Sequence, residues 1–173
     1  MRKSRGFTLI ELLIVVAIIL IIAAIAIPSL VGAKISANEA SAVNTIRTFN
    51  TAQVSYQSEF PQVGYAASLA ALGPSASTGC TTPNSTNACL VDWSVAQATT
   101  AQTSKSGYYF AESVVSSGGV NDGYTVGGAP AGFNKTGIRG FCSNEDAVIR
   151  YAPSLNGPPV AARGTCSAYP AIR

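Results

Sequence analysis

The most constraining feature of this sequence is an apolar stretch near its start, from Gly6 to Leu30. Sixteen consecutive residues, Leu12 to Ile27, carry no polar side chain. A helix from Phe7 to Ile27 is about 30 Å long, which matches the hydrocarbon thickness of a bilayer. We therefore predict a helix that lies in a membrane or in an equally dry bundle of helices.

Charges at the start of this stretch add information. Glu11 lies among the apolar residues, where a carboxylate at bilayer depth costs about 2.5–3.5 kcal/mol and is usually paired with another group. Three basic residues, Arg2, Lys3 and Arg5, stand before the stretch without any acidic residue among them. The positive-inside rule then predicts a cytoplasmic N-terminus and export of the rest of the chain.

The order of these residues resembles a known family. A basic leader ending in Gly6, then the run Phe7 to Glu11 (FTLIE), then an apolar stretch interrupted by Pro28, is similar to the class III signal of type IV pilins and pseudopilins. The resemblance implies cleavage by a prepilin peptidase between Gly6 and Phe7, N-methylation of Phe7, and assembly of subunits into a helical filament whose core is the apolar helix.

Two further expectations follow from the family. Glu11 would pair with the Phe7 ammonium of a neighbouring subunit and so fix the register between helices. Pro28, which lacks a backbone donor, would kink or locally melt the helix. Two other interpretations remain open at this stage: a secretory signal peptide with a cleavage site at Ala24 to Ala26, and an ordinary single-span anchor.

The helical pattern continues beyond the apolar stretch while becoming more polar. An apolar stripe recurs at helical spacing, and we expect it to pack against a globular domain; it consists of Ile35, Ala42, Ile46, Phe49 and Tyr56. The other faces carry Lys34, Asn38, Asn44, Arg47 and Asn50. With Pro61 as a stop, one helix from Phe7 to about Phe60 is predicted.

Residues 61–173 are rich in small residues and turn formers. We predict short helices at Ser68–Gly73 and within Leu90–Gln102, and turns at residues 116–123, at residues 143–146 and at the pairs Gly118-Gly119 and Gly127-Gly128. Strand-like stretches predict about four antiparallel strands laid on the helix stripe: Gly107–Val115, a strand beginning at Tyr124–Val126, Ile138–Cys142 and Ala147–Tyr151. The expected fold is α+β, the pilin fold, with a long N-terminal helix kinked near Pro28.

These patterns divide the chain into four segments. Residues 1–6 form a basic leader that is removed, and residues 7–30 form the membrane or filament-core half of the helix. Residues 31–60 form its amphipathic half, and residues 61–173 form the globular α+β head.

The four cysteines allow three disulfide connectivities, and an exported chain meets an oxidising compartment. We favour Cys80 with Cys89 and Cys142 with Cys166, because each link is local and because a C-terminal disulfide loop resembles the D-region of many type IV pilins. A zinc site is disfavoured, because the chain has no histidine and no Cys-x-x-Cys pair.

Catalysis is not expected. A chain without histidine has no Ser-His or Cys-His couple, and the adjacent Glu145 and Asp146 are typical of a solvated turn. We expect no enzyme activity, no metal and no cofactor. The net charge of +3 comes from the leader, since removing it leaves eight basic and eight acidic residues; no nucleic-acid partner is predicted.

The sequence therefore predicts a structural subunit of a type IV pilus filament. Its expected partners are its own copies, the prepilin peptidase and assembly machinery, and the inner membrane before assembly. The precursor belongs in a bacterial inner membrane and the assembled subunit in an extracellular pilus. The alternatives are a type II secretion pseudopilin, which shares the N-terminal pattern, and a minor pilin that acts as an adhesin or DNA-binding module.

Overall fold

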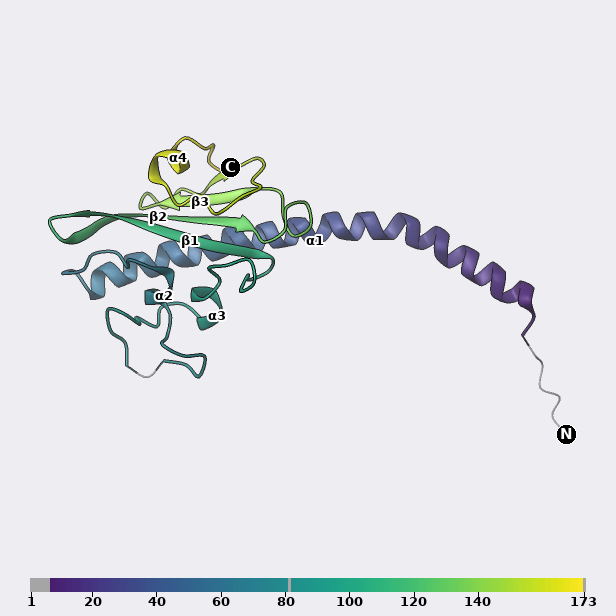
Figure 1. The fold of residues 1–173 in the computed structure, drawn as a ribbon, viewed down its shortest axis with the longest axis horizontal. Helices are drawn as coiled ribbons and strands as arrows, with labels where there is room; N and C mark the ends of the chain where they lie inside the picture. Colours follow the sequence, from purple (N-terminus) through teal and green to yellow (C-terminus); the bar gives the residue numbers. More distant parts are fainter. Residues whose placement is uncertain (1–6, 81, 173) are drawn as a thin grey trace. The chain divides into compact units, whose positions relative to one another are not determined.

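The structure is a computed structural model that describes residues 7–80 and 82–172. It has the α+β architecture of the pilin fold, with one long helix followed by a four-stranded antiparallel sheet (Figure 1). The elements in chain order are α1 (Leu9–Glu59), α2 (Leu69–Leu72), α3 (Trp93–Ala96), β1 (Tyr108–Ser117), β2 (Val120–Pro130), β3 (Gly140–Asn144), β4 (Arg150–Ala152) and α4 (Arg163–Ser167).

The long helix is confirmed almost to the residue. It ends at Glu59, where the predicted end was about Phe60, and it contains Pro28 without a break in the helical assignment. The chain forms two compact units, Met1–Lys34 and Ile35–Arg173, and α1 contributes to both. The second unit, which we call the head, holds all of the strands and the short helices.

The predicted apolar stripe is confirmed, since Ala42, Ile46, Phe49 and Tyr56 are buried and Ile35 is half-buried. The placement of Asn50 on a polar face was wrong. Asn50 is buried, and both polar atoms of its side-chain amide form hydrogen bonds inside the head. Its Nδ2 donates to Ser143 Oγ over 2.9 Å, and its Oδ1 accepts the Tyr124 hydroxyl over 3.1 Å.

The sheet has the strand order β1-β2-β3-β4, each strand antiparallel to the next. The predicted turn at residues 116–123 was too long. Strand β1 continues to Ser117 and β2 begins at Val120, because the two glycines between them make the whole connection. Gly118 and Gly119 have φ angles of +60° and +87°, as a two-residue hairpin turn requires.

The pair Gly127-Gly128 was wrongly predicted as a turn, since both residues lie in the middle of β2. Their lack of a side chain serves close packing instead. A Cβ atom on Gly127 would lie 2.2 Å from the Val160 carbonyl oxygen, and one on Gly128 would lie 2.8 Å from the Phe110 ring.

The remaining predictions are confirmed with shifted boundaries. Helix α2 has Ser68 as its N-cap and Gly73 as its C-cap, as predicted. The helix expected within residues 90–102 is only the four residues of α3, and α4 was not predicted. The turn placed at residues 143–146 begins later, because Ser143 and Asn144 belong to β3; β4 accordingly starts at Arg150 rather than at Ala147.

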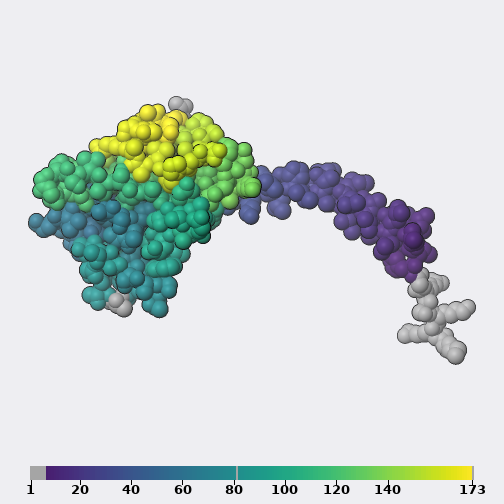
Figure 2. Space-filling model, in the orientation of Figure 1, coloured from purple at the N-terminus to yellow at the C-terminus, as the bar shows by residue number. Residues whose placement is uncertain are grey.

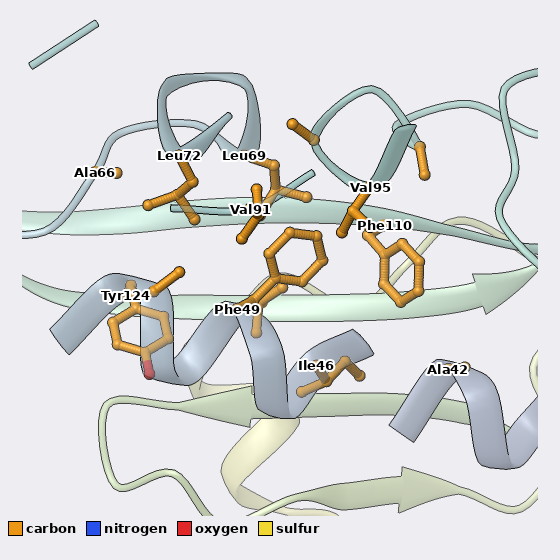
Figure 3. Close-up of a cluster of buried hydrophobic side chains, with 14 of the residues drawn as sticks. Ala42, Ile46, Phe49, Ala66, Leu69, Leu72, Val91, Val95, Phe110 and Tyr124 are labelled. Carbon is orange, nitrogen blue, oxygen red and sulfur yellow. The ribbon is translucent and has the colours of Figure 1, made fainter. Parts of the chain in front are cut away.

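The core of the head is formed where the second half of α1 meets the sheet and the segments around α2 and α3 (Figure 3). Phe49 of α1 meets Phe110 of β1 edge to face, with ring centroids 5.5 Å apart. Side chains from the other segments complete the cluster, including Leu69, Leu72, Val91, Val95 and Tyr124. Large aromatic residues thus supply much of the apolar area that holds α1 to the head.

Two disulfides cross-link the head. The structure contains the sequential pairing, Cys80 with Cys89 and Cys142 with Cys166, with Cα–Cα distances of 5.8 and 5.9 Å. Cys142 and Cys166 are buried and join β3 to α4, whereas Cys80 is exposed on a loop.

Candidate assembly site at the N-terminal segment

The N-terminal half of α1 has an apolar surface that no other described part of the chain covers. From Phe7 to Lys34 not one side chain is buried, and an 18-residue window has a mean hydropathy of 3.3. Figure 2 shows these side chains, in purple, on the surface. Exposed apolar area costs about 25 cal/mol per Å² in water, so this stretch requires a partner from outside the chain. By length and composition, α1 is able to cross a membrane.

The start of α1 is closed by reciprocal hydrogen bonds between Thr8 and Glu11. The Thr8 amide donates to Glu11 Oε2 over 2.9 Å, and the Thr8 hydroxyl donates to the same oxygen over 2.5 Å. The Glu11 amide in turn donates to Thr8 Oγ1 over a longer 3.4 Å. This arrangement is a capping box, which satisfies backbone donors that the first turn of a helix leaves free.

The capping box bonds the Glu11 carboxylate to Thr8 and holds it at the start of α1. Its carboxylate lies at the positive end of the helix dipole, where a negative charge is stabilised. Sequence analysis did not assign a role to Thr8, although the spacing Thr-x-x-Glu at Thr8 and Glu11 is the signature of this motif.

Of the other predicted residues of this segment, the two that the structure describes, Phe7 and Pro28, are not brought together by the fold. Gly6 lies outside the described residues. Phe7 precedes α1 and is 79% exposed, and Pro28 lies inside the helix almost twenty residues beyond its start. Cleavage and methylation at Phe7, and a kink at Pro28, therefore stay predictions.

An ion pair anchors α1 to the sheet at the start of the head. Glu39 is buried, and its Oε2 accepts Arg139 Nε over 2.8 Å and lies 2.7 Å from Arg139 Nη2. Its Oε1 accepts the amides of Ile138 and Arg139, each over 3.1 Å. Burial alone would raise the pKa of Glu39, but these hydrogen bonds and the Arg139 charge together lower the pKa below its ordinary value.

The adjacent carboxylates Glu145 and Asp146 are each ion-paired. Glu145 pairs with Arg163 of α4, and Asp146 pairs with Arg150 at 2.6 Å. The hydrogen bond from Arg150 is the main reason that the pKa of Asp146 is lowered. Within residues 7–80 and 82–172, no group of three or more Asp, Glu, Cys or His side chains is arranged to hold a metal ion.

Comparison with known proteins extends the description of the N-terminal segment. Residues 1–27 match the family model of the prokaryotic N-terminal methylation motif. The chain is 49% identical over 57 residues to the type IV major pilin protein PilA of Myxococcus xanthus, a match to 33% of this chain and 26% of that protein. It is 62% identical over 39 residues to the type IV wide pilus major component PilA4 of Thermus thermophilus, which covers 22% of this chain and 30% of that protein.

The similarity to these relatives extends over only part of each chain. The chain spans less than a third of the length of these curated relatives. No solved structure matches the chain. The chain thus carries a prokaryotic N-terminal methylation motif and is similar in part to type IV major pilins, and its long helix and four-stranded sheet are consistent with the α+β pilin fold.

Proposed function

We propose that this protein is a structural subunit of a type IV pilus filament, which polymerises through the apolar half of α1. The observation that carries the proposal is the surface from Phe7 to Lys34, which is apolar and is not covered by any other part of the chain that the structure describes. The two curated relatives are described as pilus or pilin components, which favours a pilus over a secretion pseudopilus.

The same apolar surface serves two environments in turn. Before assembly it spans the inner membrane, and after removal of the leader by the prepilin peptidase it packs against the same surface of other copies. Both environments are dry, so the transfer does not expose the helix to water. The head then lies on the outside of the filament, at the cell surface.

Glu11 sets the register between subunits in this scheme. Cleavage before Phe7 creates an ammonium group two residues before Leu9, the first residue of α1. The ammonium group of a neighbouring copy supplies the positive charge that a carboxylate in a dry core requires. Thr8 holds the Glu11 carboxylate beside the helix start until that neighbour arrives.

The experiment is a filament assay in the native host. Glu11→Ala should strongly reduce the pilin recovered in sheared surface filaments, while the amount of processed subunit in the membrane stays unchanged. Glu59→Gln is the matched control, because Glu59 is an exposed acid at the other end of the same helix. Filaments of Glu11→Ala as abundant as those of the parent chain would contradict the role of Glu11, and absence of the parent chain from all surface filaments would contradict the function.

A further inference from the structure

One loop of the head contains a pair of residues that react with each other. Asn156 is followed by Gly157, and this is the one place in the chain where glycine follows asparagine. The backbone nitrogen after an asparagine is able to attack the side-chain amide, and glycine shields that nitrogen least because it has no Cβ atom. The other eight asparagines are each followed by a residue with a side chain.

The reactive pair lies in residues 153–162, which connect β4 to α4 without any helix or strand. Two bonds hold this loop against the sheet. The Leu155 amide donates to the Ile138 carbonyl over 2.9 Å, and the Gly157 carbonyl accepts the Tyr109 hydroxyl over 3.4 Å. Within the described part of the head, Leu155 is the only residue of this loop whose amide donates to another backbone group. Local opening of the loop therefore costs little.

Asn156 differs from the other asparagines in its surroundings. Its side chain is exposed, and among the described residues neither that side chain nor the Gly157 amide forms a hydrogen bond. Asn134 also has an unbonded side chain, but the amide that follows it, of Lys135, donates to a carbonyl over 3.0 Å. The remaining seven all have hydrogen-bonded side chains: Asn38, Asn44, Asn50, Asn84, Asn87, Asn121 and Asn144.

We propose that Asn156 is a site of spontaneous deamidation, which changes the charge of the head as the protein ages. The Gly157 nitrogen loses its proton and attacks the carbonyl carbon of the Asn156 side chain. Ammonia leaves as a five-membered succinimide ring closes. Water then opens the ring at either of its two carbonyl carbons, which gives aspartate or isoaspartate. The net reaction converts an amide and water into a carboxylic acid and ammonia, so the loop and water are sufficient.

Each event has two effects on the head. It adds one negative charge at an exposed position, since the new carboxyl group is ionised at neutral pH. Isoaspartate also lengthens the main chain by one carbon atom between Leu155 and Gly157, the two residues that bond the loop to the sheet. Older molecules therefore differ from new ones in charge and in the path of this loop. This inference does not depend on filament assembly.

The test follows the full chain in detergent at 37 °C and neutral pH over several weeks, with peptide mapping after reduction. Trypsin releases residues 151–163 as one peptide, in which Asn156 is the one side-chain amide. We expect this peptide to become heavier by about 1 Da, because OH replaces NH2, and to separate into two products on chromatography. The peptide of residues 140–150 is the internal control. Its Asn144 is bonded to Thr125 and Ser167 and should be modified much more slowly.

Gly157→Ala is the matched variant. A Cβ atom on Gly157 meets no heavy atom within 4 Å, and the φ angle of Gly157 is not positive, so the loop should keep its structure. The added methyl group shields the attacking nitrogen and should largely abolish the mass shift over the same period. Circular dichroism checks that the variant is folded. The proposal is overturned if residues 151–163 keep their mass, if Gly157→Ala is modified as fast as the parent chain, or if aspartate is the single product, which would mean hydrolysis without the ring.

Discussion

The two halves of α1 belong to one helix but present opposite surfaces. Between Leu9 and Lys34 no side chain is buried, whereas between Ile35 and Glu59 nine residues are buried. Both halves are helical, so local conformation does not distinguish them. The second half finds its apolar partner in the sheet and loops of its own chain, and the first half requires one from outside.

The head half should respond most strongly to loss of apolar volume. Phe49→Ala removes a ring that is fully buried against Phe110, and we expect the free energy of unfolding to fall by about 3–5 kcal/mol. Ile19→Ala in the apolar half is the matched change, because Ile19 is 58% exposed. It should leave the stability of the head within about 0.5 kcal/mol of the parent value.

Thermal and urea unfolding of the two variants in detergent, followed by near-ultraviolet circular dichroism, measure this difference. Equal losses in Phe49→Ala and Ile19→Ala would show that the apolar half is part of the cooperative core of the head, and the division of α1 would be wrong.

The two disulfides should contribute unequally to the stability of the head. Chain-entropy arguments give about 3.5 kcal/mol for the link between Cys142 and Cys166 and about 2.7 kcal/mol for that between Cys80 and Cys89, because their separations are 24 and 9 residues. Paired serine substitutions should therefore destabilise the head more at the buried link, as denaturant midpoints will show. A larger loss at Cys80 and Cys89 would place more of the stability in the loop beside Trp93 than the structure indicates.

The carboxyl group of the half-buried Glu112 makes the contact of α1 with β1 sensitive to pH. Glu112 Oε1 accepts from Gln53 Nε2, while its Oε2 is buried without a partner among the described residues. Burial raises the pKa of Glu112 to about 8, although the hydrogen bond from Gln53 opposes the shift. In the unfolded chain the group ionises near its ordinary pKa of about 4.3.

The unfolded state is therefore favoured increasingly as pH rises from about 4.5 to about 8, and the head loses stability over that window. Glu112→Gln removes the ionisable group, so we expect it to be about 2–4 kcal/mol more stable than the parent chain at pH 8 and nearly equal at pH 4.5. Unfolding at both pH values measures this; a gain that is the same at both would exclude ionisation as the cause.

The smallest effect concerns the first turn of the apolar half. Thr8→Ala removes the hydroxyl from the capping box and should weaken the start of α1 by about 1 kcal/mol, whereas Thr8→Ser should not. Hydrogen exchange of the Ile10 and Glu11 amides in micelles measures the stability of this first turn directly. Faster exchange in both variants would mean that the hydroxyl is not the group that closes the helix.

The sequence was most informative where a periodic pattern ran long. The span of α1, its buried stripe and the count of four strands follow from hydrophobic spacing, because burial on one side imposes that spacing. Local turn chemistry predicted less. Gly118-Gly119 makes a hairpin and Gly127-Gly128 packs inside a strand, and only tertiary contacts with Val160 and Phe110 distinguish the two pairs.

The polar contacts inside the head could not be predicted from the sequence. Asn50 and Glu39 are ordinary surface residue types, and their burial depends on Ser143, Tyr124 and Arg139, which lie 74 to 100 residues away in the chain. The capping box at Thr8 and Glu11 is different, because it is local and its spacing is visible in the sequence.

The most direct test of the account is intact mass and N-terminal sequencing of this protein from sheared surface filaments of its native host. We predict a chain that begins at N-methylated Phe7 and contains two disulfides, since that chain combines the apolar half of α1 with an intact head. A filament chain that retains Met1 to Gly6, or an exported chain that begins near Ile27 and lacks the apolar half, would contradict the account.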